Sequence, residues 1–469
     1  MVENSASSSA MTDLEPRDTD SVVGDLNEVA MLDDLQVTEE IDLGPDDVPP
    51  PDEESELGDG SVMGSGDEME EMAMEDYGQD KAGAAGASAD AAAPSEPVED
   101  LSVQCLRAHT SAVFAVAVNP AQPHVFATGG GDDVAHLWRL GSEAPMAALR
   151  GHTDSVSSVG FSADGSYLAT GGLDGAVRVW AADGSLVVLL EGPTQGINWV
   201  CWHARGHVLL AGSEDATAWM WKVPEGSVMQ IFSAHSASVS YGGFANGGRS
   251  VITASEDGTI RLWNPRAGTV EHCTHASPPH EPEAVTCLAP HPSQAVYLFG
   301  VESGAVKMCT APARAAPAPP AIAPRPAASP RPSLCPSAHA ESGKLLASLP
   351  AHEDSVEAAS FCECMPLAAT GGMDGKLCIW DLNTYGLRHT CLHGAGVIEA
   401  VWRRGSPLVF SCTVSKEVRL WDARSGACLN TLTGHTDAVL CLAVGYPEAG
   451  AYLVSGSDDN TARVWALDV

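Results

Sequence analysis

Short runs of alternating apolar and polar residues recur between residues 109 and 465, and the same order of runs returns eight times. Each complete unit has a His, a short apolar run, a second run that ends in Ser or Thr and Gly, and then an Asp that is followed six residues later by a Trp. The clearest copy contains His152, Thr170, Asp174 and Trp180. A period of two predicts β-strands, and a fixed repeat of about 40 residues predicts a solenoid or a propeller.

The spacing of the tryptophans gives the number of units. Successive intervals are 42, 41, 42, 117, 41 and 44 residues for Trp138, Trp180, Trp221, Trp263, Trp380, Trp421 and Trp465. The gap of 117 residues contains a degenerate copy, in which Cys309 stands at the position of Trp, and then an insert. Removing about 30 residues of insert restores the ordinary spacing, so the chain has eight units.

The turns between the runs support the same architecture. They contain Asp-Gly or Asn-Gly pairs, as at 164–165 and 374–375, which are typical of tight hairpins. We therefore predict an all-β fold, an eight-bladed β-propeller over residues 101–469 with one four-stranded sheet per blade. Trp465 lies four residues from the end of the sequence, so the eighth unit lacks an outer strand, and we expect residues 101–107 to supply it.

Five units combine a Ser or Thr, a His and an Asp, which are the residue types of a hydrolytic nucleophile, base and orienting acid. Five copies at one phase of a repeat cannot all be active sites, and no Gly-x-Ser-x-Gly turn accompanies them. In the stronger interpretation the His bonds the Asp, and the chain of buried polar groups ends on the indole N–H of the Trp. We therefore predict no catalytic residues and assign structural tetrads to His109, Thr128, Asp132 and Trp138; His152, Thr170, Asp174 and Trp180; His235, Thr253, Asp257 and Trp263; His352, Thr370, Asp374 and Trp380; and His435, Ser455, Asp459 and Trp465.

Three units depart from this pattern. The third has Pro193 at the His position, the fifth has Glu281 for His and Ser303 for Asp, and the seventh has Ser415 for Asp. We expect these blades to lack part of the internal network and to be looser than the others.

Acidic residues are concentrated at the N-terminus. Of 62 Asp and Glu residues, 30 lie in residues 1–100 against two bases, Arg17 and Lys81, so this segment carries −28 of the formal charge of −38. Its one aromatic residue is Tyr77. Such a segment cannot bury enough apolar surface to offset its ordering entropy, so we predict a disordered acidic tail. It either solubilises the chain or attracts a basic partner.

A second segment of unusual composition is rich in Pro and Ala. Residues 310–340 contain nine prolines, and we predict an extended, polyproline-like loop inserted between blades five and six. A tolerated surface insertion is the simpler interpretation. The alternative is a docking sequence at residues 317–320 for a domain that binds proline-rich peptides.

The sequence has no recognisable secretory leader and no apolar stretch approaching 18 residues, so we expect no membrane association. The 13 cysteines are odd in number and scattered, which favours reduced thiols inside the cell. Cys362 and Cys364 are close together but lack the Cys-x-x-Cys spacing, so we expect no metal site and no cofactor. We expect a cytoplasmic monomer, with the nucleus as a second location.

One face of the predicted propeller should be acidic. The residue before each Asp position projects towards the loops that enter the inner strands, and these residues are Gly131, Leu173, Glu214, Glu256, Glu302, Met373, Val414 and Asp458. Four are acidic and none is basic. A ring of one charge sign focuses its field and captures an oppositely charged segment. Chance is the alternative in an acidic chain, but the bias sits at one phase of the repeat.

This face predicts a basic protein or peptide as partner. The loops after the histidines add further acids, and we assign partner binding to Glu214, Glu256, Glu302, Glu353, Asp458, Asp154 and Asp354. Nucleic acid is disfavoured, because the longest basic run is Arg403–Arg404 and phosphates would be repelled. Trp199, Trp219 and Trp402 fall at strand positions and are more typical of core than of apolar anchors.

The Trp-Asp pairs at 380–381 and 421–422 resemble the signature of the WD40 family. Stretches outside that signature are similar to the angio-associated migratory cell protein family and its fungal members, namely residues 209–224, 365–369, 388–393 and 418–426. An acidic tail before eight units and an insert after the fifth also match. The resemblance covers residues 101–469, and the proline-rich character of the insert departs from it.

The resemblance implies an eight-bladed propeller without catalytic activity. Its fungal member is a dedicated chaperone that holds the basic N-terminal segment of a large-subunit ribosomal protein on the acidic propeller face, and animal members are linked to cell migration and signalling. We therefore expect a non-catalytic chaperone or escort of a basic ribosomal protein in ribosome biogenesis. The alternatives are a general scaffold or adaptor in signalling or cell migration, and a histone-binding protein.

Overall fold

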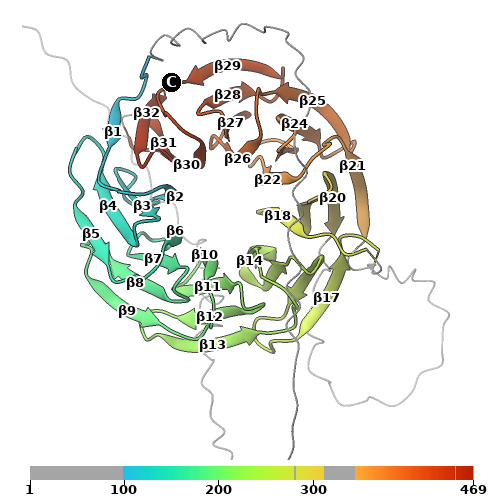
Figure 1. The fold of residues 1–469 in the computed structure, drawn as a ribbon. Coiled ribbons are helices and arrows are strands. Elements are labelled where there is room, and N and C mark those ends of the chain that lie inside the picture. The colour runs from blue at the N-terminus through green and yellow to red at the C-terminus, as the bar shows by residue number, and fades with distance from the viewer. Residues whose placement is uncertain (1–98, 279–280, 311–343, 449, 468–469) are drawn as a thin grey trace, which may run out of the picture. The chain divides into compact units, whose positions relative to one another are not determined.

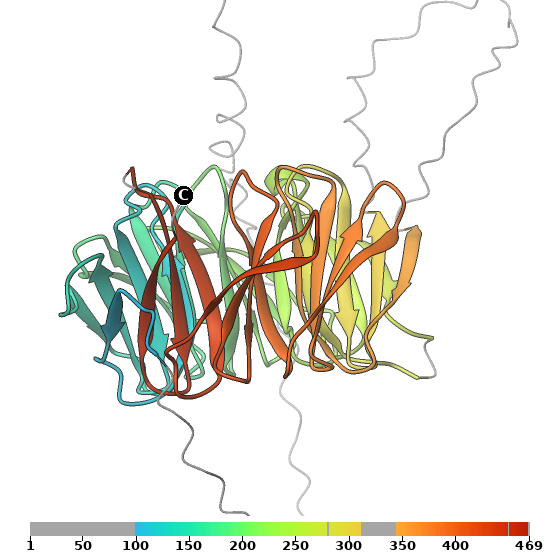
Figure 2. The ribbon, with the colours of Figure 1, turned by 90° about the horizontal axis from the view of Figure 1, so that it is seen from above.

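A computed structural model describes residues 99–278, 281–310, 344–448 and 450–467. In these residues 32 strands form eight four-stranded antiparallel sheets. The sheets are arranged as the blades of a ring around a central opening (Figure 1), and the strands run across the thickness of that ring (Figure 2). The predicted all-β, eight-bladed propeller is confirmed. The predicted tail falls on residues outside the described part of the chain, apart from Glu99 and Asp100.

Each blade has an inner, a second, a third and an outer strand. The inner strands are β2 Val113–Val118, β6 Val156–Phe161, β10 Ile197–Trp202, β14 Tyr241–Ala245, β18 Val285–Pro290, β22 Val356–Phe361, β26 Val397–Trp402 and β30 Val439–Gly445. The second strands are β3 Val125–Gly130, β7 Tyr167–Gly172, β11 Val208–Ser213, β15 Ser250–Ala254, β19 Val296–Val301, β23 Leu367–Gly372, β27 Leu408–Thr413 and β31 Ala451–Ser457.

The third strands are β4 Val134–Arg139, β8 Val177–Ala181, β12 Ala218–Lys222, β16 Thr259–Trp263, β20 Ala305–Thr310, β24 Lys376–Asp381, β28 Val418–Asp422 and β32 Ala462–Leu467. The outer strands are β5 Ala147–Arg150, β9 Leu186–Leu190, β13 Ser227–Phe232, β17 Val270–His275, β21 Leu345–Pro350, β25 Gly386–Leu392, β29 Ala427–Leu432 and β1 Gln104–Leu106. One short 3-10 turn, η1 Asn246–Gly248, follows β14. Among the described residues, no helix has the length and apolar character needed to cross a membrane.

The second strands are the most deeply buried because neighbouring blades cover both of their faces. Every residue of β3, β11 and β23 is buried, which explains their continuous apolar sequences. Glycine is required where the next blade comes closest. A Cβ atom on Gly171 would lie 2.7 Å from Ile197 Cγ2, and one on Gly371 would lie 2.5 Å from Val397 Cγ1. The Gly at the end of the second run therefore allows one sheet to pack against the next.

The ring closes by pairing the first described strand with the last. β1 is antiparallel to β32, with Gln104 opposite Val464 and Leu106 opposite Ala462. Leu106 is 1% exposed and packs in a cluster with residues of blades one and eight. The prediction that residues 101–107 complete the eighth blade is confirmed. Closure removes an open end that would otherwise expose an apolar sheet face.

The Pro/Ala-rich segment has a different place in the topology from the one predicted. β20 ends at Thr310 and β21 begins at Leu345, and both strands belong to the fifth sheet. The segment therefore joins the third and outer strands of blade five rather than blades five and six. The repeat count could not distinguish the two, because an insert after Cys309 can fall on either side of the outer strand without changing the spacing of the units. Residues 311–343 themselves lie outside the described residues.

Closure of the ring can be tested with Leu106→Ala. Truncating this buried side chain leaves a cavity between blades one and eight, so we expect the free energy of unfolding to fall by about 2–5 kcal/mol in urea denaturation. Val103→Ala is the matched control, because Val103 lies in the same segment but is 64% exposed, and its effect should stay within about 0.5 kcal/mol. Equal effects of the two variants would contradict closure by this strand.

Candidate protein-binding face

Five blades contain hydrogen-bonded tetrads. The His Nδ1 lies 2.9–3.0 Å from an Asp carboxylate oxygen. The His Nε2 lies 2.7–2.9 Å from the hydroxyl of a Ser or Thr. The indole N–H of the Trp donates to the same hydroxyl over 2.8–3.0 Å. The five histidines are His109, His152, His235, His352 and His435.

The donors in each tetrad can be assigned from the Trp. An indole N–H only donates, so the hydroxyl accepts it and directs its own hydrogen to His Nε2. The remaining imidazole proton then lies on Nδ1, facing the Asp. Burial lowers the pKa of His152 and outweighs the attraction of Asp174, so the imidazole is neutral. Burial acts to raise the pKa of Asp174, but hydrogen bonds from His152 and from the backbone of Thr153 prevail and lower it.

The Asp carboxylate also connects two loops of its blade. It accepts the N–H of the residue that follows the His, over 2.9 Å from Thr110 to Asp132 and over 3.1 Å from Glu353 to Asp374. The Asp lies in the turn between the second and third strands, whereas the His lies in the loop that enters the inner strand. Each tetrad therefore fixes the two loops that form one face of the propeller.

The third blade lacks most of this network. Ala211 occupies the hydroxyl position, and the indole N–H of Trp221 has no hydrogen-bond partner in the described part of the chain. Asp215 nevertheless accepts the N–H of Thr194 over 2.8 Å. The contact that joins the two loops is therefore kept where the His is lost.

The fifth and seventh blades keep other parts. In the fifth, Phe299 and Cys309 fill the hydroxyl and Trp positions, and Ser303 donates to Glu283 over 2.9 Å. In the seventh, His393 Nε2 lies 2.8 Å from the hydroxyl of Ser411, which also accepts the indole N–H of the Trp. Without an Asp partner, burial lowers the pKa of His393 to about 4. Greater looseness of these blades stays a prediction.

The eight residues before the Asp positions surround one opening of the propeller. The backbone N–H of each donates over 2.8–3.2 Å to the carbonyl of a residue at the entrance to the inner strand of its own blade, as from Glu214 to Gly196. The inner strands line the central opening (Figure 1), so these residues lie beside it. We call this set the rim: Gly131, Leu173, Glu214, Glu256, Glu302, Met373, Val414 and Asp458.

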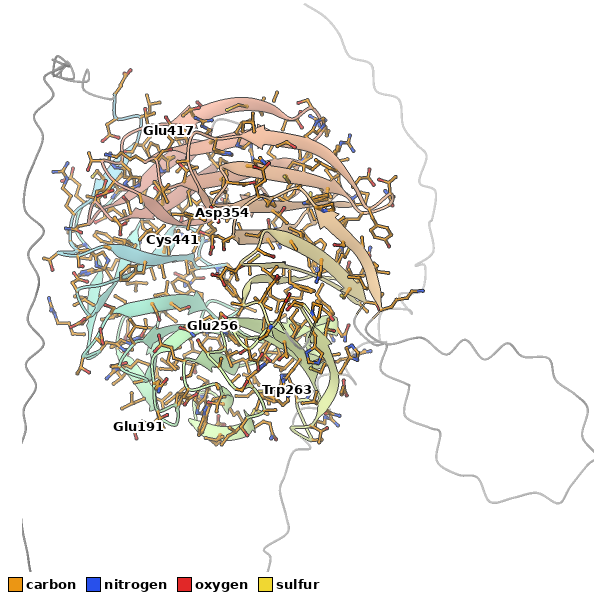
Figure 3. The ribbon with its side chains drawn as sticks, turned by 45° about the vertical axis from the view of Figure 1, so that its right-hand side comes forward. Glu191, Glu256, Trp263, Asp354, Glu417 and Cys441 are labelled. Carbon is orange, nitrogen blue, oxygen red and sulfur yellow. The ribbon has the colours of Figure 1, made fainter. Side chains whose placement is uncertain are left out.

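The acids of the rim are exposed and unpaired. Glu214, Glu256 and Glu302 occupy blades three, four and five, and Asp458 occupies blade eight. Their carboxylates form no hydrogen bond or ion pair with the residues that the structure describes. Burial raises the pKa of Asp458, and the nearby charge of Asp437 raises it further. Figure 3 shows Glu256 beside the central opening. The rim therefore carries concentrated negative charge that remains available to a partner.

The other predicted acids lie in the loops after the histidines and are less available. Asp154 and Asp354 each accept the N–H of the next residue, over 2.7 and 2.8 Å. Glu353 accepts a bond from Lys376 Nζ over 2.8 Å, so its charge is partly compensated. All three side chains are exposed. Their main contribution is negative charge on this face, because their carboxylates already accept hydrogen bonds within the protein.

Sequence reasoning did not single out Phe114 or Glu399. Phe114 is 40% exposed and lies against Gly131 of the rim. Glu399 lies in β26, accepts the N–H of Leu442 in β30 over 2.6 Å, and has a pKa raised to about 7 by burial. An acid inside the apolar run of β26 could have identified it from the sequence. Nothing in the sequence indicated that Phe114 is exposed, because an aromatic residue in a strand usually lies in the core.

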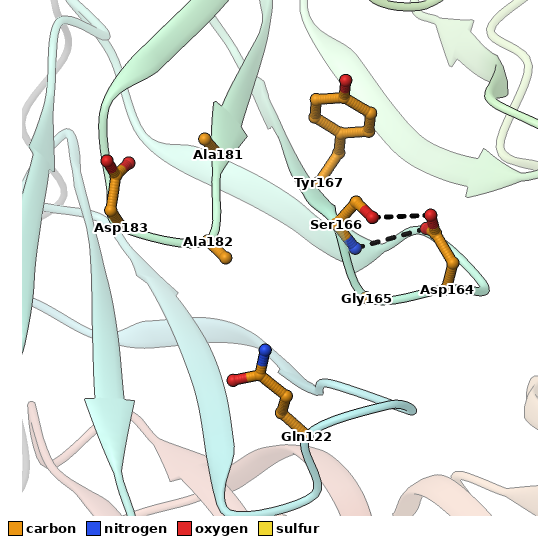
Figure 4. Close-up of a pocket in the computed structure, with 8 residues that line it drawn as sticks. All are labelled: Gln122, Asp164, Gly165, Ser166, Tyr167, Ala181, Ala182 and Asp183. Carbon is orange, nitrogen blue, oxygen red and sulfur yellow. Dashed lines mark hydrogen bonds between the residues drawn. The ribbon is translucent and has the colours of Figure 1, made fainter.

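Two surface cavities lie away from the rim. One, of about 550 Å³, is lined by turns of blades one and two and includes Gln122, Asp164 and Asp183 (Figure 4). The other, of about 510 Å³, includes Trp402 and Arg403 at the ends of inner strands. Both adjoin the turns between first and second strands, at the strand ends opposite to the rim. Neither cavity is part of the acidic face.

One tetrad has a second imidazole beside it. The rings of His109 and His136 lie 4.7 Å apart in an edge-on arrangement, and ligand atoms of these residues and Asp132 lie within 4.8 Å of one another. Burial lowers the pKa of His136 to about 4, so this ring is neutral. The bond between His109 and Asp132 has the same length as in the other four tetrads, within 0.1 Å. We therefore assign this pair the same structural role.

Comparison with known proteins identifies the class. The family model "WD domain, G-beta repeat" matches residues 101–139, 143–181, 184–222, 226–264, 343–381 and 426–466. The chain therefore belongs to the WD40 repeat family. The first three strands of blades five and seven lie outside these matches, and these are the blades in which the tetrad Asp is replaced by Ser303 and Ser415.

Within this family the chain is similar to angio-associated migratory cell protein of Homo sapiens, with 34% identity over 76% of this chain and 78% of that protein. It is also 34% identical to the ribosome assembly protein SQT1 of Saccharomyces cerevisiae, over 33% of this chain and 40% of that protein. The crystal structure of Sqt1 from S. cerevisiae has a TM-score of 0.68 at 22% identity, covering 79% of this chain and 100% of that one. Sqt1 of Chaetomium thermophilum bound to the N-terminus of ribosomal protein L10 gives 0.67 at 22%, with the same coverage.

The tetrad geometry can be tested with Thr170→Val. The variant keeps the side-chain shape but leaves the indole N–H of Trp180 and Nε2 of His152 without partners, so we expect a loss of about 2–4 kcal/mol in unfolding free energy. Thr153→Val makes the same chemical change at an exposed position of the same blade and should have little effect. A loss below about 0.5 kcal/mol in Thr170→Val would contradict the structural role.

The half-buried acid Glu399 predicts a pH dependence. Its pKa is raised to about 7, above the usual value near 4.3, so its contribution to stability is full below about pH 4 and is lost as the pH rises towards 7. Glu399→Gln should therefore be about 1–3 kcal/mol more stable than the parent at pH 8 and equal to it near pH 4. Glu191→Gln, at an exposed position, is the control. A Glu399→Gln variant less stable than the parent at pH 8 would overturn this account.

Proposed function

We propose that this chain is a cytoplasmic, monomeric chaperone or escort that captures a basic segment of a large-subunit ribosomal protein on its acidic rim. The observation that carries the proposal is the arc of unpaired carboxylates at Glu214, Glu256 and Glu302, which neighbouring blades present at one opening. The function requires no catalysis. The tetrads that contain Ser or Thr, His and Asp are used to hold the loops of this face.

Electrostatics supports a cationic client. Charges of one sign around an opening with low-dielectric walls produce a focused field, which raises the rate of encounter with an opposite charge. An unassembled ribosomal protein is basic and needs its charge masked before it meets RNA. The chain itself offers few competing bases, with 22 Lys and Arg against 32 Asp and Glu outside residues 1–100.

Two relatives support the ribosomal client in particular. SQT1 of S. cerevisiae is a ribosome assembly protein, and C. thermophilum Sqt1 was crystallised with the N-terminus of ribosomal protein L10. A propeller of the same fold therefore binds the N-terminus of a ribosomal protein, which supports a ribosomal client for this chain. Angio-associated migratory cell protein, which covers more of this chain, favours the second candidate, a scaffold in cell migration. Such a scaffold would bind partners without regard to rim charge.

Reversing the rim charge tests the proposal. In the triple variant Glu214→Lys, Glu256→Lys and Asp458→Lys, we expect binding of a basic ribosomal N-terminal peptide to weaken at least about tenfold in low salt, because close charge pairs of opposite sign become repulsive. Isothermal titration calorimetry or fluorescence anisotropy provides the affinity. In the parent, raising the salt should weaken binding steeply, because exposed pairs are screened over about 8 Å at physiological ionic strength.

The matched control reverses three exposed acids at the opposite strand ends: Glu143→Lys, Glu363→Lys and Glu448→Lys. Its net charge equals that of the rim variant, so a general charge effect would weaken both proteins equally. Circular dichroism and thermal unfolding establish that both remain folded. Undiminished binding by the rim variant would show that the rim is not the site and would leave the scaffold as the better function.

A further inference from the structure

The rim carries apolar as well as acidic side chains, and the two kinds occupy different parts of the ring. Glu214, Glu256 and Glu302 lie in consecutive blades, and we call them the acidic arc. Met373 in blade six and Val414 in blade seven are 39% and 38% exposed. Both residues occupy the rim position of their blades, at the edge of the opening.

The second residue of the inner strand segment follows this division in six of the eight blades. Asn198, Ser240 and Thr286, in blades three to five, each bond a backbone carbonyl of the next blade, at Val239, Val285 and Val356. Their polarity is therefore accounted for by contacts between blades. In blades seven, eight and one the same position holds Ile398, Leu440 and Phe114, whereas blades two and six have Ser157 and Glu357 there. Phe114 is 40% exposed, and it extends the apolar side of the opening inward from the rim.

The apolar side chains of this face are unusual for the molecule. The described residues include 18 exposed large apolar side chains, and 14 of them lie in the outer strands or within three residues before them. The four that remain are Phe114, Leu173, Met373 and Val414, and all four lie at the rim or against it. We call these four the apolar arc. In ring order they occupy blades six, seven, one and two. Asp458 in blade eight interrupts them, and the exposed loop acids Asp154, Glu353 and Asp354 lie on the same face in blades two and six.

Glycines make room for this arc. A Cβ atom on Gly396 would lie 2.7 Å from Met373 Sδ, and one on Gly131 would lie 2.9 Å from the ring of Phe114. A Cβ atom on Gly196 would likewise lie 3.0 Å from Leu173. Three of the four apolar side chains therefore lie over positions where any larger residue would displace them.

We propose that the rim selects an amphipathic extended segment, whose basic side chains meet the acidic arc while its apolar or aromatic side chains meet the apolar arc. This inference rests on the proposed function. It adds selection for apolar side chains in the client, which charge alone does not provide. Successive side chains of an extended chain point to opposite sides, so one short segment across the opening can reach both arcs. A basic segment without apolar residues would satisfy one arc only.

The two arcs should contribute in ways that salt separates. Attraction to the acidic arc is screened by ions, whereas burial of apolar surface is not weakened by added salt. A client that uses both arcs should therefore keep part of its affinity in salt that releases a purely basic peptide. This gives the protein a means to reject other polycations, which share the charge of the client but not its apolar side chains.

Two synthetic peptides of equal charge test the inference. In one, Lys and Arg alternate with Phe and Leu; in the other, Ser replaces every Phe and Leu. We expect the parent protein to bind the amphipathic peptide at least about tenfold more tightly, with a smaller fractional loss of affinity at high salt. The triple variant Phe114→Ser, Met373→Ser and Val414→Ser should lose this preference while it binds the serine peptide as the parent does.

The matched control replaces three apolar residues of the outer strands, Leu186→Ser, Val228→Ser and Leu387→Ser, which are 52%, 47% and 47% exposed, and it should keep the preference. If the parent binds both peptides equally, and the variant Phe114→Ser, Met373→Ser and Val414→Ser binds them as the parent does, the apolar arc plays no part. The inference is then wrong while the proposed function stands. If the parent binds neither peptide, the proposed function fails, and the inference fails with it.

Discussion

The geometry of the binding face depends on hydrogen bonds that join two loops of a blade: the His–Asp bond in five blades and, in all eight, the backbone bond from the rim residue to the entrance of the inner strand. Each joins a loop entering an inner strand to the turn after a second strand, as between His152 and Asp174 at 3.0 Å. A hydrogen bond to a charged group contributes about 1.5–3 kcal/mol net, and it is repeated in five blades. Blades three, five and seven lack the His–Asp bond, and there the backbone bond of the rim residue, as from Glu302 to Ala284 at 3.2 Å, still joins the two loops.

The acidic and apolar arcs are possible because these hydrogen bonds do not involve the side chain at the rim position. Once the backbone of a turn is held by the Asp and by the bond to the inner strand, the side chain before the Asp has no structural task. Such a position can be Gly131, Glu256 or Met373 without harm to the blade. The division into arcs is therefore a feature of the surface and is not required for packing. An opening with an acidic side and an apolar side is suited to one orientation of a bound segment.

Much of the fold and of the rim could be predicted from the sequence, because the residues that recur in each repeat are those that the fold requires. The Trp intervals, the tetrads and residues 101–107 each have one place in a closed ring, and Glu214 and Asp458 follow from repeat phase. The position of the Pro/Ala segment could not be predicted, since an insert after Cys309 fits either side of an outer strand. Phe114 was missed because exposure of a strand residue depends on the curvature of the ring, which no single unit contains.

Hydrogen–deuterium exchange of the whole chain, with and without a basic ribosomal N-terminal peptide, tests the central claim most directly. The account predicts added protection in the turns that carry Glu214, Glu256 and Glu302 and in the loops that enter the neighbouring inner strands, with little change at the opposite strand ends. Protection confined to the outer strands, or to the turns that contain Asp164 and Arg403, would place the partner elsewhere and contradict the account.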